Sequence, residues 1–438
     1  MAPGAQLCHS AGPGTSGANV GTPVIHNEVA AMHVIMIAPH FPANQRQFAR
    51  ALKQVGAFVT GIGEASIDAL PNEIKGYLDA YEQVGNVCNQ DMLLETVRKI
   101  QRRGPWVHRL EATVEAHISS AAAVRELTGI PGLSVRNSVL CRDKPTMKEF
   151  LRDNGIQCAQ STGADSVEEA VSFAKRVGFP LIMKPRAGAG ASGTVRVDSL
   201  DELRKESEGY RLGRGGSCAV EEFIEGHEGF YDTLSIDNQV AIEFVTHYFP
   251  GVLEAMRSRD VAPYFITTNR VDSPGYNEVK QMGQRVIQAM GLGTTATHME
   301  WFFGPKGLKF SEIGARPPGV GTWDLYCAAN DFDLYRQWAH AIVHGRLDQR
   351  PSRRFSAAMI SIRPNRDGRV AGYRGFEEVQ NKIGGQLIDW YLPAEGMPTQ
   401  PVDAGYMANA WIRLRHTDYD TLRQMCEWVG NTVRMYAK

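Results

Sequence analysis

Short apolar segments alternate with amphipathic segments along the first third of the chain. The apolar segments have the length of strands buried on both faces, and the amphipathic ones carry apolar residues such as Phe48 and Leu52 at helical spacing. The predicted strands are 33–39, 57–63 and 105–110, and the predicted helices are 45–56, 91–104 and 111–129. Because alternating strands and helices form parallel sheets covered on both faces, we expect a parallel α/β unit over residues 31–140.

Start and stop signals predict further elements between residues 141 and 350. The segment 143–155 begins with an acidic residue and a proline and ends at a glycine, and 166–178 opens with a Ser-x-x-Glu capping box. Strands are predicted at 179–185 and 194–199, helices at 199–209, 275–291 and 322–345, and a hairpin at 296–314. The segments 218–226 and 229–237 lie between them. Residues 351–438 have the pattern of a small mixed α/β module.

The composition narrows the class of protein. The 438 residues are enough for two or three domains, and 43% hydrophobic with 22% charged residues is typical of globular proteins. A formal net charge of -1 argues against a protein that coats nucleic acid or a membrane surface, because either usually carries a basic excess. The sequence contains no run of 18 apolar residues. We therefore expect neither a nucleic-acid nor a membrane partner.

The first 30 residues and the cysteines bear on the cellular compartment of the protein. Residues 1–30 are rich in Gly, Ala, Pro, Ser and Thr and lack the basic start and apolar run of a secretory signal, so we expect a disordered leader. The seven cysteines are scattered and form no C-x-x-C pair. They predict neither a disulfide framework nor a zinc site, and the simplest setting is a reducing cytoplasm.

The stretch 184-KPRAGAGASGT-194 contains the pattern G-x-G-x-x-G. A dinucleotide fingerprint would need a helix after its glycines, but the β-branched segment 194–199 predicts a strand; a P-loop would need Gly-Lys-Ser/Thr. The alternative that remains is a glycine loop between antiparallel strands, where backbone amides approach phosphates closely and Lys184 supplies a positive charge. The other alternative is a flexible surface turn.

The hairpin 298-HMEWFFGPKGLKFSEIGAR-316 carries two acids, Glu300 and Glu312. If an odd-length loop is centred on Lys306, the two carboxylates lie opposite each other on one face, whereas a two-residue Pro305–Lys306 turn places them on opposite faces. Neighbouring carboxylates repel unless a cation joins them, and Mg²⁺ binds through a few carboxylates and nucleotide phosphates. Arg316 could then hold a phosphoryl group or a carboxylate. The alternative is an ordinary ion pair of Glu300 with Arg316 or Lys309.

These motifs, in this order, resemble the ATP-grasp superfamily over about residues 105–345. The resemblance implies ATP contacts by Lys144 in 142-RDKPTMKEFLRDNGI-156, by Lys184, and by the mobile loop that contains Gly188, Gly190, Ser192 and Gly193. In 220-VEEFIEGHE-228 it implies that Glu221 and Glu222 flank the adenine, that Ile224 packs near it and that Glu228 binds ribose hydroxyls. It further implies magnesium (or manganese) ligation by Glu300 and Glu312 and a catalytic role for Arg316.

Within the superfamily, the sequence is most similar to the carboxylate–amine ligases of the L-amino acid ligase (dipeptide synthetase) type. Many members have Asn where this chain has Gly314, which puts the second metal's coordination in doubt, and this branch tolerates the glycine. The implied fold is α/β: two α+β subdomains that grip ATP (141–350, with a lid at about 180–250), a Rossmann-like domain before them and the module 351–438 after them. The implied reaction phosphorylates a carboxylate, and an amine then attacks the acyl phosphate to give an amide. Small acids and amines, amino acids among them, are the expected partners, and members are often homodimers.

The residues that bind the second substrate are less defined. Position near the motifs makes candidates of His298, Asp232, Arg257, Gly319 and Trp323. His298 could instead be a structural hydrogen-bonding histidine, Asp232 could pair with a neighbour, and the loop 317–322 could only cap the next helix. Two other functions stay open, namely a carboxylase or purine-pathway enzyme on the same fold, although no Met-Lys-Met biotin motif occurs, and a non-catalytic nucleotide-binding protein.

Overall fold

The computed structural model describes residues 31–188 and 193–438. Residues 32–438 cluster as one unit. The expected leader lies outside the described residues, and so do Gly190 and Ser192 of the glycine loop.

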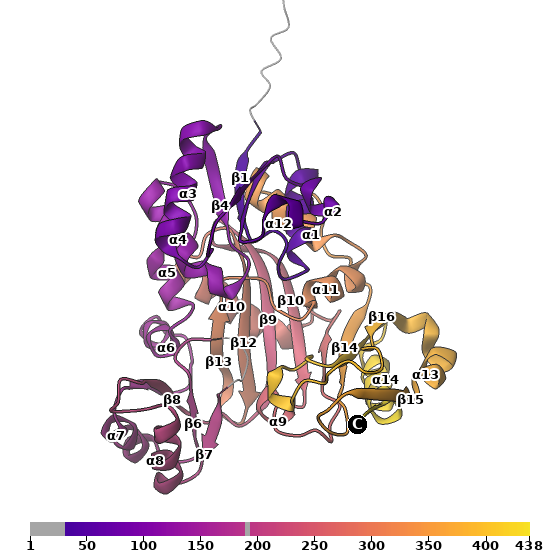
Figure 1. Ribbon diagram of the computed structural model, residues 1–438. Helices are drawn as coiled ribbons and strands as arrows, with labels where there is room; N and C mark the ends of the chain where they lie inside the picture. Colours follow the sequence, from indigo (N-terminus) through magenta and orange to yellow (C-terminus); the bar gives the residue numbers. More distant parts are fainter. Residues whose placement is uncertain (1–30, 189–192) are drawn as a thin grey trace, which may run out of the picture. The chain divides into compact units, whose positions relative to one another are not determined.

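The N-terminal part contains a parallel four-stranded sheet in the order β3-β2-β1-β4. Its elements are β1 (His33–Ile37), α1 (Gln45–Gln54), β2 (Phe58–Gly63), α2 (Asn72–Lys75), β3 (Ala80–Gln83), α3 (Gln90–Arg103), β4 (Val107–Glu111), α4 (Ile118–Thr128) and α5 (Val135–Leu140). Alternate residues of β1 enter different cores: Ile35 and Ile37 pack with α3 and α4, whereas Val34 and Met36 pack with α1. Figure 1 shows α3 and α4 on one side of the sheet and α1 on the other. The expected parallel sheet with helices on both faces is thus present.

The helix predicted at 111–129 begins later than expected. Strand β4 continues through Glu111, a short 3₁₀ turn spans Glu115–His117, and α4 starts only at Ile118. This shift places Glu115 outside the helix, in the connection that follows the strand.

A second, eight-stranded sheet forms the centre of the unit, in the order β13-β12-β9-β10-β11-β14-β17-β16. Its strands are β9 (His227–Ile236), β10 (Gln239–Phe249), β11 (Tyr264–Thr267), β12 (Thr295–Gly304), β13 (Gly307–Gly314), β14 (Ser356–Ile362), β16 (Leu387–Tyr391) and β17 (Ala410–His416). The helices α10 (Asn277–Met290), α11 (Thr322–Asn330) and α12 (Leu334–His344) cover it. Gly283 allows α10 to approach β9 closely, because a Cβ there would overlap the ring of Tyr231.

A third sheet of four strands, in the order β5-β8-β6-β7, follows α6 (Lys144–Asp153). Its elements are β5 (Ser161–Ala164), α7 (Val167–Val177), β6 (Leu181–Lys184), β7 (Val195–Val197), α8 (Leu200–Gly209) and β8 (Cys218–Glu222). The capping box of α7 is present, since Ser166 Oγ accepts the amide of Glu169 and Glu169 accepts that of Ser166. The lid expected at about 180–250 is displaced: this sheet spans residues 161–222, and β9 and β10 belong to the large sheet because they pair with β12 and β11.

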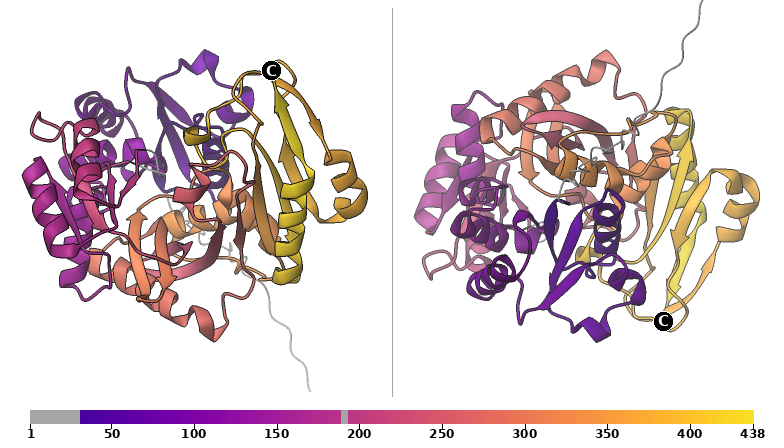
Figure 2. Two further views of the ribbon diagram at one scale, coloured as in Figure 1. Left: turned by 90° about the horizontal axis from the view of Figure 1, so that it is seen from below. Right: turned by 90° about the horizontal axis from the view of Figure 1, so that it is seen from above.

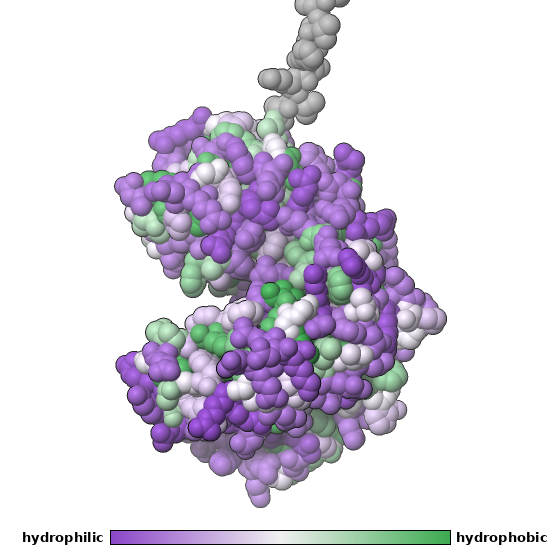
Figure 3. Space-filling view, turned by 90° about the vertical axis from the view of Figure 1, so that its right-hand side faces the viewer, coloured by the Kyte–Doolittle hydropathy of each residue, from purple (hydrophilic) through white to green (hydrophobic). Residues whose placement is uncertain are grey.

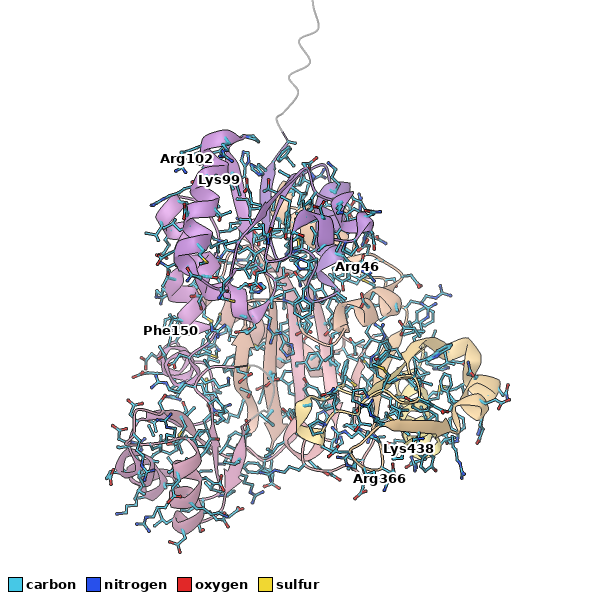
Figure 4. All side chains as sticks on the ribbon, viewed as in Figure 1. Arg46, Lys99, Arg102, Phe150, Arg366 and Lys438 are labelled. Atoms are coloured by element: carbon cyan, nitrogen blue, oxygen red, sulfur yellow. The ribbon has the colours of Figure 1, made fainter. Side chains whose placement is uncertain are left out.

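The C-terminal residues extend the large sheet. Strands β14, β17 and β16 add to its edge, and α13 (Phe376–Ile383) and α14 (Tyr419–Thr432) pack beside them. Figure 2 shows these yellow strands continuing beside the orange ones. A two-stranded sheet of β15 (Val370–Arg374) and β18 (Arg434–Ala437) closes the chain. Arg366 and Lys438 lie close together there (Figure 4), and Arg366 Nε donates to the carbonyl of Ala437 at 2.8 Å.

The surface is mostly hydrophilic on the face shown in Figure 3, and a deep notch divides it into an upper and a lower part. Among the residues that the structure describes, no helix has the length and apolar character needed to cross a bilayer.

Candidate active site

A cavity of about 310 Å³ lies where the third sheet meets the large sheet. It is lined by most of the residues that the sequence predicted to bind ATP or metal: Lys144, Lys184, Gly188, Glu221, Glu222, Ile224, Glu228, Glu300 and Glu312. Gly193 is not among the lining residues, and Gly190 and Ser192 lie outside the described residues. Strands β6 and β7 pair antiparallel on either side of the glycine loop, as expected.

Two lysines meet at one end of this cavity. Lys144 is the first residue of α6, and its Nζ donates to the carbonyl of Gly188 at 3.0 Å and lies 3.4 Å from Glu312 Oε2. Lys184 ends β6, with Nζ 3.0 Å from Glu221 Oε2 and 3.9 Å from Glu312 Oε2. Burial disfavours the charged form of Lys184, but Glu221 and Glu312 outweigh it and raise its pKa. The site therefore keeps a positive charge beside Glu312, where an anionic phosphate would be stabilised.

Lys148 belongs to the same cluster, although the sequence analysis missed it. It lies one helical turn after Lys144, is 1% exposed, and its Nζ is 2.6 Å from Glu221 Oε2. Burial lowers the pKa of Lys148 to about 8 despite the nearby Glu221. Burial alone would raise the pKa of Glu221, but Lys148 and Lys184 lower it to about 2. The carboxylate of Glu221 thus contacts Lys148 and Lys184, a role that the resemblance did not predict. The i, i+4 spacing of Lys144 and Lys148 was a signal that Lys148 lies on the same face of α6 as Lys144.

Apolar side chains also line the cavity, among them Ile224 and Phe302. Glu222 contacts Lys306 and accepts the amide of Gln160 at 3.2 Å. Glu228 is buried and accepts the amide of Val252 at 2.6 Å, at the start of α9 (Val252–Ala255). Burial, together with the charge of Glu300, raises the pKa of Glu228 to about 8.

The two acids of the hairpin face each other, but for a reason other than the expected one. Gly304 pairs with Gly307, so only Pro305 and Lys306 form the turn, and the expected odd-length loop is wrong. By strict alternation this turn would place the carboxylates on opposite faces. A shift of register between Glu300 and Trp301 adds one residue to β13, and Glu300 consequently pairs with Glu312. A β-bulge thus restores the predicted juxtaposition.

The carboxylate pair fits a nucleotide-bound magnesium ion. Burial disfavours the charged form of Glu300, but the imidazole of His298, 3.7 Å away, and the charges of Lys184 and Lys144 outweigh it and lower the pKa of Glu300. Among the described residues, no group of three His, Cys, Asp or Glu side chains gathers as a complete metal site. Mg²⁺ usually takes one or two carboxylates and completes its shell with phosphate oxygens and water, so two carboxylates beside the lysine cluster suit it.

A second, smaller cavity adjoins the first and shares Lys144, Gly188 and Glu312 with it. Arg316 lines it, donating from Nε to Glu115 Oε2 at 2.9 Å and from Nη1 to the carbonyl of Pro317 at 2.9 Å. Arg142 lies 3.3 Å from the other oxygen of Glu115. Glu115 and Arg142 were not predicted, since Glu115 was assigned to a helix that begins further along.

His298 also lines the second cavity. Its Nδ1 lies 2.6 Å from Asp232 Oδ1, whose other oxygen accepts the hydroxyl of Tyr326 at 2.5 Å. Burial lowers the pKa of His298, but Asp232 and Glu300 outweigh this effect and raise the pKa to about 9. Asp232 itself is 1% exposed and lines neither cavity, so it orients His298 from behind.

Three candidates for the second substrate lie elsewhere. Trp323 is buried in the core against Phe48, with ring centroids 5.1 Å apart, and its expected role as a substrate contact is wrong. Arg257 is exposed after α9 and lines neither cavity. The carbonyl of Gly319 accepts the amide and hydroxyl of Thr322, so this loop begins α11, which was the alternative left open.

The described geometry agrees with comparisons to known proteins. Residues 149–332 match the family model of the ATP-grasp domain. These residues match an ATP-grasp domain, and the chain has the α/β ATP-grasp fold that the sequence predicted. The crystal structure of an L-amino acid ligase from Bacillus licheniformis is similar over 93% of this chain and 99% of that one, with a TM-score of 0.72 and 16% identity.

Curated relatives are distant. The L-arginine-specific L-amino acid ligase of Bacillus subtilis is 27% identical over 244 residues, 54% of this chain and 58% of that protein. The carbamoyl phosphate synthase large chain of Rubrobacter xylanophilus is 25% identical over 76% of this chain and 32% of its own length. A formate-dependent phosphoribosylglycinamide formyltransferase of Bacteroides fragilis is 24% identical over 65% of this chain and 71% of its own. The chain thus matches less than two thirds of the first two relatives.

Proposed function

We propose that the chain is an ATP-dependent, ADP-forming ligase that joins a carboxylic acid to an amine through an acyl phosphate. One observation carries the proposal: the two cavities meet at Lys144, Gly188 and Glu312. A nucleotide in the larger cavity would place its terminal phosphate at this junction. An acid bound beside Arg316 and His298 in the smaller cavity would then reach that phosphate.

The chemistry has two steps. A carboxylate oxygen attacks the γ-phosphorus, the bond to the β-phosphate oxygen breaks, and ADP leaves. The amine then attacks the acyl carbon, the carbon–oxygen bond to the phosphoryl group breaks, and phosphate and a proton leave. Lys144, Lys184 and Arg316 neutralise charge as the phosphoryl group moves. When bound at Glu300 and Glu312, magnesium would supply further neutralisation of the phosphate oxygens.

The cations of the smaller cavity support an acid as the first substrate. Arg142, Arg316 and the protonated imidazole of His298 line it, and guanidinium groups bind carboxylates bidentately. The name of the Bacillus subtilis relative supports amino acids as substrates. A second candidate is the activation of formate or bicarbonate, which the formate-dependent relative and the small size of this cavity favour.

To test the proposal, the protein is incubated with Mg-ATP and pairs of L-amino acids. The release of ADP and phosphate is measured, and the products are identified by mass spectrometry. Formate and bicarbonate are assayed in parallel, each with an amine. Release that requires two amino acids, with a product lighter by one water than their sum, supports the ligase. Release that requires formate or bicarbonate as the acid supports the second candidate. Bound ATP without release in any combination contradicts both and leaves a non-catalytic nucleotide-binding protein.

A further inference from the structure

A separate cavity of about 220 Å³ lies in the C-terminal part of the chain. It is enclosed by residues 259–262, by the end of β14 and by the region of β18, and shares no lining residue with the two cavities of the candidate active site. Three arginines line it, Arg259, Arg363 and Arg434, and Asp260 is the one acid among its lining residues. The lining thus carries a net charge of +2, from three cations and one anion.

Arg363 is the unusual member of this group. Its Nη1 donates to the carbonyl of Ala255, the last residue of α9, and to that of Ser258, but Nη2 is buried without a hydrogen-bond partner among the described residues. No carboxylate of the described residues forms an ion pair with it. Burial lowers the pKa of this guanidinium. A buried, unsatisfied donor on a charged group is costly, and such donors usually have a partner.

The two other arginines leave room for an anion. Arg259 donates to Asp367 Oδ1 at 2.6 Å and to the carbonyl of Pro364 at 3.2 Å. Arg434 is exposed and donates to the carbonyl of Gly430 at 2.6 Å. Each guanidinium has five N–H donors, so unused donors remain on both. The two carbonyls that accept from Nη1 fix the orientation of the Arg363 guanidinium, and Arg363 is one of the residues that line the cavity.

We propose that this cavity binds the phosphate group of a small molecule, with Arg363 Nη2 as its buried donor and Arg259 and Arg434 as further cations. A phosphate accepts several hydrogen bonds, carries up to two negative charges and suits planar guanidinium donors. The volume is below that of pockets for drug-sized ligands, which favours inorganic phosphate or a small phosphate monoester. The site does not depend on the proposed ligase activity.

The exposed Arg434 provides a direct readout in the full-length protein. Phenylglyoxal modifies accessible arginines, and mass spectrometry of peptides gives the rate at each position. Inorganic phosphate and glycerol 3-phosphate are titrated separately against chloride at constant ionic strength. We expect saturable protection of Arg434, by about fivefold or more, whereas exposed Arg102 on α3 (Figure 4) reacts at an unchanged rate. The anion with the lower half-saturation identifies the source of the phosphate group.

Two variants test the role of Arg363. Arg363→Met removes the buried donor, and we expect the half-saturating phosphate concentration to rise about tenfold, as for the loss of one charge-assisted hydrogen bond. Arg259→Gln is the second variant, because its side chain is nearer the surface and its loss should not unfold the protein. Arg102→Gln is the matched control, with unchanged protection. Equal protection of Arg102 and Arg434, no protection, or wild-type protection in both variants would overturn the proposal.

Discussion

Arg316 and Arg257 were both predicted to contact substrates, and the structure separates them. Arg316 lines the smaller cavity, fixed by Glu115 and by the carbonyl of Pro317, whereas Arg257 is exposed and lines neither cavity. We expect Arg316→Ala to lower kcat by about 10²–10³, the effect of losing one preorganised charge donor, with the Kd for ATP within about threefold of wild type. Product formation by mass spectrometry and ATP binding by calorimetry check both values.

Arg257→Ala is the matched control and should leave turnover and ATP binding unchanged. If Arg316→Ala weakens ATP binding and turnover equally, Arg316 serves the nucleotide and not the acid. If Arg257→Ala lowers turnover as much as Arg316→Ala, the smaller cavity is not the acid site.

Glu221 offers a test of buried charge at a single residue. It holds Lys148, which is 1% exposed, and Lys184 at 2.6 and 3.0 Å. Glu221→Gln would leave these two cations without their shared anion, and breaking a buried pair costs about 3–5 kcal/mol of unfolding free energy. Urea unfolding checks the loss. The neighbouring Glu222→Gln, whose partner Lys306 is exposed, should change the unfolding free energy by less than about 1 kcal/mol. Similar losses in both variants would contradict the special position of Glu221.

Gly314, which replaces the asparagine of many superfamily members, has room for a side chain. A Cβ there would lie 3.5 Å from Arg316 Cγ and 3.6 Å from Glu115 Oε2, both ordinary contacts. We expect Gly314→Asn to fold with a stability within about 1 kcal/mol of wild type, and to lower the Mg²⁺ concentration for half-maximal turnover by adding an oxygen donor. Gly229→Asn is the contrast, because a Cβ at Gly229 would overlap the ring of Trp301 and should unfold the protein. An unstable Gly314→Asn would show that the space is filled.

At the scale of elements, the contact between α10 and β9 depends on one glycine. Alanine is normally better than glycine within a helix by about 1 kcal/mol, but a Cβ at Gly283 would overlap the ring of buried Tyr231. Overpacking of this kind costs about 1–3 kcal/mol, so we expect Gly283→Ala to be destabilised. In the control Gly209→Ala, at the end of α8, a Cβ meets no atom within 4 Å, and stability should stay equal or rise. Thermal unfolding of both variants decides whether the helix can move away from the strand.

Some features of the site could be predicted from local sequence signals, and others depend on how the elements pack. Lys144, Lys184, Glu300 and Glu312 were expected at one site, and all four line one cavity of the structure. The expectation for Lys144 came from the family resemblance, whereas Lys184 follows a strand signal and the two glutamates flank a turn signal. Glu300 does lie opposite Glu312, but the odd-length loop from which this was expected is wrong. Turn residues show where a hairpin reverses, but a bulge at Ser311 depends on packing within the sheet, and the sequence carries no local sign of it.

The assignment of strands to sheets was beyond local patterns as well. Strands β9 and β10 are consecutive with β8, yet they pair with β12 and β11, which lie further along the chain, and the lid therefore ends earlier than expected. Trp323 shows the same limit at one position, since its proximity in sequence to Arg316 suggested a substrate contact but its ring packs on Phe48 of α1. Glu115 and Arg142 join Arg316 only through the fold.

At the scale of the whole molecule, buried histidines couple stability to pH. His247 of β10 lies between His227 and the hydroxyl of Tyr276, each 2.8 Å away. Burial, with the nearby His227 and Arg423, lowers the pKa of His247 to about 3. Burial also lowers the pKa of His33 and of His117 in the N-terminal part. These side chains are therefore neutral in the folded protein at pH values where they are protonated in the unfolded chain.

The sign of the pH dependence follows from this difference. The unfolded pKa of a histidine is about 6.5, so the contribution of His247 is fully present above about pH 6.5 and is lost as the pH falls toward 3. The slope is up to about 1.4 kcal/mol per pH unit, and we expect His247 alone to reduce the unfolding free energy by about 2 kcal/mol between pH 6.5 and 5. Urea unfolding at a series of pH values measures the slope.

Two variants separate the titration of His247 from its hydrogen bond. His247→Gln should be less stable at pH 7.5, since it loses the bond to Tyr276, but its unfolding free energy should fall less steeply as the pH is lowered. Tyr276→Phe loses the same bond and keeps the histidine, so its slope should stay as in the wild type; equal slopes in all three proteins would show that His247 is not protonated on unfolding in this range.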